Sequence, residues 1–148
     1  MTTAFKTVQD ALVAALLTPP TIVGTRVVAG RGLPLPAEHT SDIVVSIESV
    51  NGADVALTSH PQDWEVVYGV EMRARGSAAV DAVTALDPIL EAAYARLMAT
   101  PPPAGVMGWV LTPRIRVDVD ESATPVGTLQ LSINVRMRTQ PAGLLLAA

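Results

Sequence analysis

Residues 64–75 alternate between apolar and polar side chains, which is the period of a half-buried β-strand. Gly76 and Ser77 end this alternation, and apolar residues then recur at helical spacing. Since both elements have one apolar face and are adjacent in the chain, we predict that the helix packs on the sheet. The apolar strand face is Trp64, Val66, Tyr68, Val70, Met72 and Ala74, and the helix stripe is Val80, Val83, Leu86, Leu90, Ala93, Tyr94 and Leu97.

Capping and helix-breaking residues predict where this helix begins and ends. Ser77 is the expected N-cap, and the three prolines after Thr100 end the helix. Pro88 is predicted to kink the helix, or to restart it with Asp87 as a new cap.

The remaining segments predict one α+β domain over residues 1–148, with a short apolar tail at 140–148. We expect a single mixed or antiparallel sheet of about five strands, with two helices packed on one face. The other expected elements are a helix at 5–17 ended by Pro19 and Pro20, strands at 21–29, 42–50, 114–120 and 129–139, a loop at 30–37, a turn at Asn51–Gly52 and a hairpin connection at 121–127. Ile115, Val117 and Val119 are predicted to face inward, as are the odd-numbered residues of 129–137.

Composition excludes several classes of protein. With 148 residues, 49% hydrophobic, a net charge of -4 and no cysteine, the chain is neither disordered nor held by disulfides or thiolate metal sites. It lacks the basic surface typical of nucleic-acid binding, a membrane span of about 20 apolar residues and a secretory signal. Its mean hydropathy of +0.38 is high for a small domain, which favours a subunit that buries surface against other subunits.

Two groups of possible metal ligands do not have a persuasive spacing. His39 and His60 are far apart in sequence and have no third ligand at a typical spacing. Asp118, Asp120 and Ser122 match the start of a calcium loop, but the glycine and the bidentate glutamate that should follow are absent. Solvated histidines and an exposed hairpin end are the more economical interpretations, so we predict no metal.

Catalytic motifs are also lacking. Ser77 follows a glycine and opens a helix, yet neither base nor nucleophile elbow accompanies it. Gly30 and Gly32 lack the later glycine, lysine and helix of a phosphate loop. We therefore expect no cofactor and no enzymatic activity.

Arginines occur in three pairs spaced two residues apart, on the polar face of the predicted sheet. One interpretation is a solvated sheet face, because acidic residues accompany them. The alternative is a protein–protein surface, where arginine is enriched and lysine is depleted. The pairs are Arg73 and Arg75, Arg114 and Arg116, and Arg136 and Arg138.

Three stretches together resemble the tail terminator (tail completion) proteins of long-tailed bacteriophages, the family that includes minor tail protein U of lambda-like phages. The first is the opening helix followed by Gly-Arg-Gly-Leu-Pro-Leu-Pro-Ala-Glu at 30–38 and Asp-Ile-Val-Val-Ser-Ile-Glu-Ser at 42–49. The second runs from Trp64 to Gly76, through Ala-Ala-Val-Asp-Ala-Val and on to Ala-Tyr-Ala-Arg-Leu-Met. The third is Arg-Ile-Arg-Val-Asp-Val-Asp at 114–120 followed by 129–139.

The resemblance implies a structural role in the virion. Such proteins form a hexameric ring on the last ring of the tail tube, stop tube polymerisation and present the docking surface for the head-completion complex. The implied partners are further copies of the chain, the major tail tube protein and a neck protein, with DNA passing through the lumen without specific binding. A monomeric state of the free chain is compatible with this role. The implied location is the head-proximal end of the tail, after assembly in the host cytoplasm and without membrane contact. Candidate residues for ring or partner contacts are Arg31, Leu33, Leu35, Glu38, Arg73, Arg75, Arg114, Arg116, Arg136 and Arg138.

Two other functions remain open at the level of sequence. Another head–tail joining or neck protein would use a similar sheet and helices. A small α+β ligand-binding domain or enzyme would need convergent polar groups in a pocket.

Overall fold

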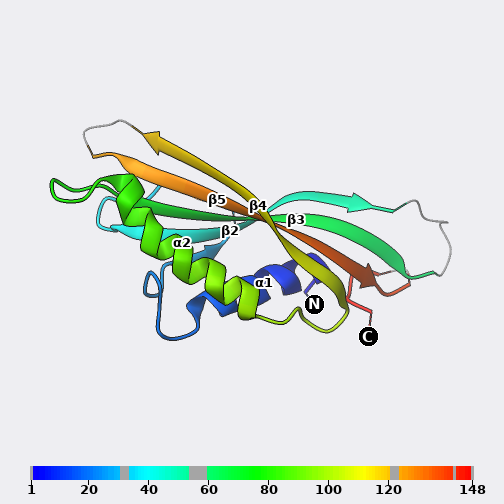
Figure 1. Ribbon diagram of the computed structural model, residues 1–148. Helices are drawn as coiled ribbons and strands as arrows, with labels where there is room; N and C mark the ends of the chain where they lie inside the picture. Colours follow the sequence, from blue (N-terminus) through cyan, green and yellow to red (C-terminus); the bar gives the residue numbers. More distant parts are fainter. Residues whose placement is uncertain (1, 31–33, 54–59, 121–123, 142, 148) are drawn as a thin grey trace.

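The computed structural model describes residues 2–30, 34–53, 60–120, 124–141 and 143–147. A single five-stranded sheet has the order β1-β2-β3-β5-β4, and only β1 and β2 are parallel. Both helices cover one face of this sheet (Figure 1), which confirms the predicted α+β class. The elements are α1 (Ala4–Leu17), β1 (Val27–Ala29), β2 (Ser41–Gly52), β3 (Gln62–Arg75), α2 (Ala82–Ala99), β4 (Val106–Asp120) and β5 (Val126–Thr139).

The core lies between the helices and the central strands. Tyr68 and Met72 on β3 are fully buried, as predicted, and Leu86 on α2 and Leu12 on α1 belong to the same cluster. The Tyr68 hydroxyl donates a 2.9 Å hydrogen bond to the Phe5 carbonyl. Burial raises the pKa of Tyr68, so the hydroxyl remains protonated and keeps this link between sheet and helix.

Helix α2 begins later than the sequence analysis predicted. Its N-cap is Asp81, whose Oδ1 accepts hydrogen bonds from the amides of Val83 and Thr84. Its hydrogen bond from the Thr84 hydroxyl is the main cause that lowers the pKa of Asp81. Ser77 instead caps the preceding turn, where its Oγ accepts from the amides of Ala79 and Val80.

The residues of α2 that face the core also differ from the predicted stripe. The buried positions are Ala82, Leu86, Ile89, Ala93 and Leu97, whereas the predicted stripe members Val80, Val83 and Tyr94 are exposed. The helix also continues through Pro88, so the alternative of a restart at Asp87 is wrong. A proline removes one backbone hydrogen bond, and the buried side of α2 continues on both sides of it.

Two predictions near β2 are wrong. The strand predicted at 21–29 contains only Val27–Ala29, because Gly24, with φ +66°, places a turn in its first half. The turn predicted at Asn51–Gly52 is still strand, since these residues pair with Glu65 and Trp64 of β3. Six residues of the following connection, 54–59, lie outside the described residues.

Strand β4 is longer than predicted, because it starts at Val106 rather than at Arg114. Val117 and Val119, predicted to face inward, are exposed. They lie on the edge strand, one strand beyond the β5 residues that α2 covers. The side chain of Ile115 and residues 121–123 of the predicted hairpin connection lie outside the described residues. The last two residues of that connection, predicted at 121–127, belong to β5.

The chain end folds back along β5. The Ala147 amide donates to the Arg138 carbonyl at 2.8 Å, and the Ala4 amide donates to the Leu144 carbonyl at 2.6 Å. The tail therefore lies beside both β5 and the first residue of α1, close to the N-terminus (Figure 1). Gly105 makes this possible, since it has a φ of +84° and a Cβ there would overlap the Ala147 carbonyl.

We predict that Gly127→Ala destabilises the fold. A Cβ at Gly127 would lie 3.0 Å from the Ala82 carbonyl oxygen and 2.9 Å from Leu86 Cδ1, so α2 would have to move off β5. The expected loss is about 1–3 kcal/mol, the usual cost of overpacking, measured by urea unfolding. Gly108→Ala is the matched control, because a Cβ there meets nothing within 4 Å. Equal stability of the two variants would contradict the close approach of α2 to β5.

Candidate functional site

The face of the sheet opposite the helices carries the predicted arginines, and the structure gives most of them partners within the chain. Arg73 lies on β3 and donates from Nε and Nη2 to the two carboxylate oxygens of Asp42 on β2, at 2.8 and 2.5 Å. Both side chains are buried, and Glu71 lies 3.8 Å from Arg73 Nε. This bidentate pair therefore joins β2 to β3.

Arg75 holds the loop that precedes β2. Its Nη2 donates to the carbonyls of Leu35 and Pro36, each at 3.2 Å, and its Nε donates to the His39 carbonyl at 3.4 Å. Leu35 is buried against this arginine side of the sheet, whereas Glu38 is exposed. Arg31 and Leu33, also predicted contact residues, lie outside the described residues.

Arg136 and Arg138 on β5 pair with acidic residues of β3. Arg138 donates to both oxygens of Asp63, at 2.6 and 2.9 Å, which lowers the pKa of Asp63 and raises that of Arg138. The Glu65–Arg136 pair is looser, at 3.6 Å, and both side chains are mostly exposed. These arginines therefore cross-link neighbouring strands.

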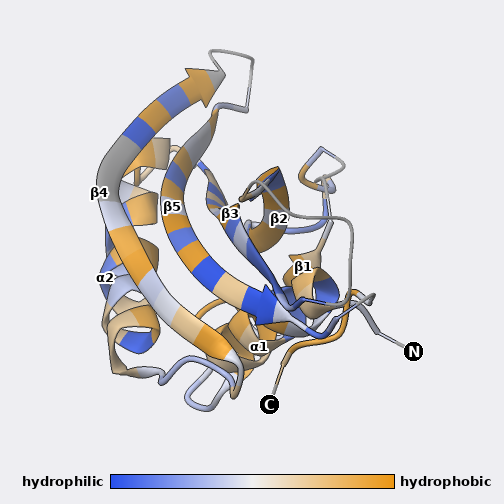
Figure 2. Ribbon diagram, turned by 90° about the vertical axis from the view of Figure 1, so that its right-hand side faces the viewer, coloured by the Kyte–Doolittle hydropathy of each residue, from blue (hydrophilic) through white to orange (hydrophobic). Residues whose placement is uncertain are grey.

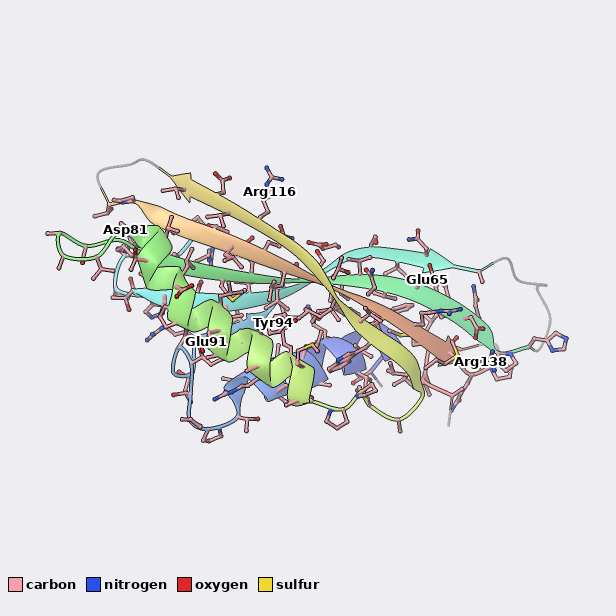
Figure 3. The ribbon with its side chains drawn as sticks, viewed as in Figure 1. Glu65, Asp81, Glu91, Tyr94, Arg116 and Arg138 are labelled. Carbon is pink, nitrogen blue, oxygen red and sulfur yellow. The ribbon has the colours of Figure 1, made fainter. Side chains whose placement is uncertain are left out.

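Arg116 on β4 differs from the other described arginines. It is exposed and directed away from the sheet (Figure 3), and it has no hydrogen-bond or ion-pair partner among the described residues. The side chain of Arg114 lies outside the described residues. The structure thus brings most of the predicted arginines onto one face, where Arg73, Arg136 and Arg138 pair across strands and Arg75 binds the loop before β2.

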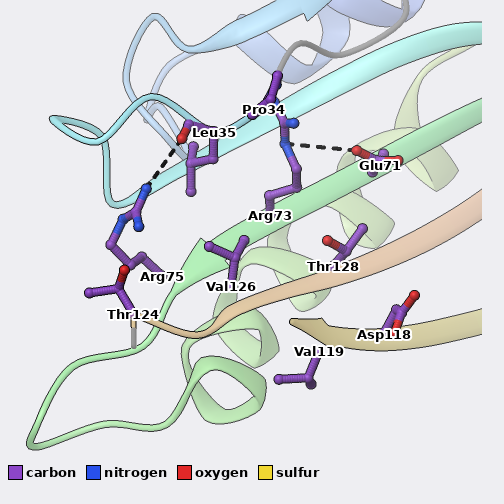
Figure 4. Close-up of a pocket in the computed structure, with 10 residues that line it drawn as sticks. All are labelled: Pro34, Leu35, Glu71, Arg73, Arg75, Asp118, Val119, Thr124, Val126 and Thr128. Carbon is purple, nitrogen blue, oxygen red and sulfur yellow. Dashed lines mark hydrogen bonds and ion pairs between the residues drawn. The ribbon is translucent and has the colours of Figure 1, made fainter. Parts of the chain in front are cut away.

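An open pocket of about 480 Å³ lies on this face (Figure 4). Two arginines and two carboxylates line it, and both arginines already have partners within the chain. Its ionisable lining groups are these two carboxylates and two guanidinium groups, and its described lining contains no histidine. The lining residues are Pro34, Leu35, Glu71, Arg73, Arg75, Asp118, Val119, Thr124, Val126 and Thr128.

Two further features are absent from the described part of the chain, a metal-ligand cluster and a membrane-spanning helix. No group of three or more His, Cys, Asp or Glu side chains there is placed to hold a metal ion. None of the helices in that part is long and apolar enough to cross a membrane.

The exposed apolar side chains belong mainly to two neighbouring elements of the fold. Most of the exposed large apolar residues belong to β4, to α2 or to the turn before α2. Val110 on β4 and Met98 on α2 are the most exposed of them, at 64% and 61%. The group consists of Val80, Val83, Tyr94, Met98, Met107, Val110, Val117 and Val119, which we call the β4–α2 surface.

A groove of about 350 Å³ runs along the β4–α2 surface, between the C-terminal end of α2 and β4. Met98 and Leu97 line it from the helix, and Trp109 and Leu111 line it from the strand. Prolines 101 and 102, which follow α2, close one end. The groove is therefore a mainly apolar hollow beside an edge strand.

Strand β4 forms the outer edge of the sheet, where Figure 2 shows apolar stretches along much of its length. Residues 106–112 carry no charged side chain, and on their outer side they have no strand partner among the described residues. Proteins usually protect such an edge with lysines, prolines, bulges or a covering loop. Two bulges interrupt the β4–β5 pairing, but the stretch between them is a regular open edge.

Sequence reasoning missed this edge. The prediction began the strand at Arg114, where alternation is visible, and left the preceding residues unassigned. Val-Met-Gly-Trp-Val-Leu at 106–111 does not alternate, because Trp109 and Leu111 line the groove while Val110, between them, is apolar on the open face. The signal that was present is the richness in β-branched and aromatic residues.

Comparisons with known proteins find similar solved structures but no family. No protein-family model matches the chain, and no curated protein matches its sequence. Among solved structures, the chain is similar to a chain of the virion of native gene transfer agent (GTA) particle, with 20% sequence identity and a TM-score of 0.49. The alignment covers 88% of this chain and 94% of the other. A likeness of this size does not establish function.

We predict that the buried Asp42–Arg73 pair contributes far more to stability than the exposed Glu65–Arg136 pair. Asp42→Ala removes both carboxylate oxygens that the buried Arg73 guanidinium contacts, so the expected loss is about 3 kcal/mol, near the lower end for a broken buried pair. Glu65→Ala, on the same face, should shift the urea midpoint little, since exposed pairs contribute little. Similar urea midpoints for the two variants would contradict a larger contribution of the buried Asp42–Arg73 pair to stability.

Proposed function

We propose that this chain is a structural virion protein that caps the tail tube of a phage-like particle as a ring. In this role it ends tube polymerisation and provides the surface to which the head-joining proteins dock. It acts by assembly rather than by catalysis, at the head-proximal end of the tail. Its partners are copies of itself in a hexamer, the major tail tube protein and a neck protein.

The β4–α2 surface is the observation that carries this proposal. A lone subunit leaves this strand edge, its groove and the surrounding apolar side chains in water, and large exposed apolar patches are typical of interaction sites. A ring subunit covers such a surface with its neighbour. The six-fold number and the position on the tail come from the sequence resemblance to tail terminators.

The open face of the sheet supports passage of DNA without binding. Arg73, Arg136 and Arg138 each have a carboxylate partner, so their charge is locally compensated. Together with a net charge of -4, this leaves few unpaired cations among the described residues of this face to hold phosphates.

The proposal is tested by deleting the gene from the phage or phage-like element that encodes it and imaging the particles by electron microscopy. A terminator is expected to leave tail tubes of uncontrolled, excessive length that are not joined to filled heads. Restoring the gene on a plasmid is the control and should return tails to one length.

Two results would contradict the terminator role. Tails of normal length that fail to join heads would reassign the protein to the neck. Normal infectious particles would exclude a structural role in the virion and leave a ligand-binding or enzymatic domain as the remaining possibility.

A further inference from the structure

The sheet has a second open edge, opposite β4. Strand β1 pairs only with Ile43–Val45 of β2, so residues 46–52 of β2 have no strand on their outer side among the described residues. The one charged side chain in this stretch, Glu48, accepts a hydrogen bond from Gln130 Nε2 on β5. It reaches across β3 because Gly69 has no side chain there, since a Cβ would lie 2.5 Å from Glu48 Oε1. The Glu48 carboxylate therefore lies over the sheet and not at the open edge of β2.

The two open stretches lie at the same end of the sheet. Pairing across the strands places Gly52, Trp64, Met137 and Val106 in one row. A second row contains Ser49, Val67, Asn134 and Val110. Residues 46–52 of β2 therefore stand level with residues 106–112 of β4.

Strand direction also suits a contact between these edges. Each of the pairs β2–β3, β3–β5 and β5–β4 is antiparallel, so β2 and β4 run in opposite directions. A second copy placed beside the first in the same orientation brings its β2 antiparallel to β4. The antiparallel arrangement is the commoner and slightly more stable form of strand pairing.

The exposed apolar residues distinguish this arrangement from a two-fold dimer. Val28 on β1 and Val50 on β2 are exposed at one edge, and Met107 and Val110 are exposed at the other. A symmetric β4–β4 contact would leave Val28 and Val50 in water. A head-to-tail contact covers both sets in every copy, and repeated around an axis it closes into a ring.

We infer that a second copy of this chain covers β4 by pairing residues 46–52 of its β2 antiparallel to residues 106–112. The groove beside Trp109 then receives apolar side chains from the β1–β2 edge of that copy. This inference rests on the proposed self-assembly and specifies its contact, which neither the sequence resemblance nor hydropathy identifies.

Disulfide trapping tests the contact directly, because the chain contains no cysteine of its own. Ser49→Cys and Val110→Cys place one thiol on each edge, in the same row and on the same face. An equimolar mixture of the two purified variants under mild oxidation should give a mixed disulfide dimer, whereas each variant alone should remain monomeric on a non-reducing gel. The double variant should give a ladder of larger species.

Ala14→Cys, on the exposed side of α1, is the matched control and should give no dimer with Ser49→Cys above background. Unchanged melting temperatures establish that the variants fold. Dimers of Val110→Cys alone would show a two-fold β4–β4 contact and overturn the inference, as would a mixed dimer no stronger than the control. Failure here alongside overlong tails in the deletion mutant would reject this contact and retain the terminator role.

Discussion

The pairing of β3 with β5 is the interaction on which the rest of the structure depends. The two strands are paired without a bulge from Gln62 and Thr139 to Arg75 and Val126. Because side chains alternate, this register places Tyr68, Met72 and Ile133 under the helices and the carboxylate–arginine pairs on the other face. The same register sets which residues of β2, on one side, stand level with which residues of β4, on the other.

The same register separates two kinds of surface. On the open face, carboxylates from β2 and β3 meet arginines from β3 and β5, so the polar groups stabilise one another across strands. At the edges, backbone groups and apolar side chains have no such partners among the described residues. The need for a partner is therefore greatest at the rim of the sheet, which is where a ring subunit meets its neighbours.

Much of the sheet and its helical cover was predictable from local periodicity. The alternation in 64–75 and 129–139 and the helical spacing around Leu86 and Ala93 each contain enough residues to identify the element and its buried side. Periodicity fails where both faces of a strand are apolar, as at 106–111, and where exposure depends on a distant element. Val117 is exposed because it lies on the edge strand, one strand beyond the β5 residues that α2 covers. The local sequence pattern does not contain this information.

The partners of the predicted contact residues could not be predicted from local sequence either. The arginine pairs were visible in the sequence, but the partners Asp42 and Asp63 are 31 and 75 positions away from Arg73 and Arg138. Pairing over such distances depends on strand order. The β4–α2 surface likewise exists only once the fold has brought the two elements together, so composition predicted that apolar surface would be exposed without locating it.

Hydrogen exchange of the free and the assembled protein tests most directly whether the sheet edges are the subunit contact. On assembly, the amides of 106–112 and 46–52 should become protected together, because each edge gains a strand partner, while the β3 amides remain slow in both states. Protection that is unchanged at both edges, or gained at 106–112 alone, would contradict a head-to-tail contact between them.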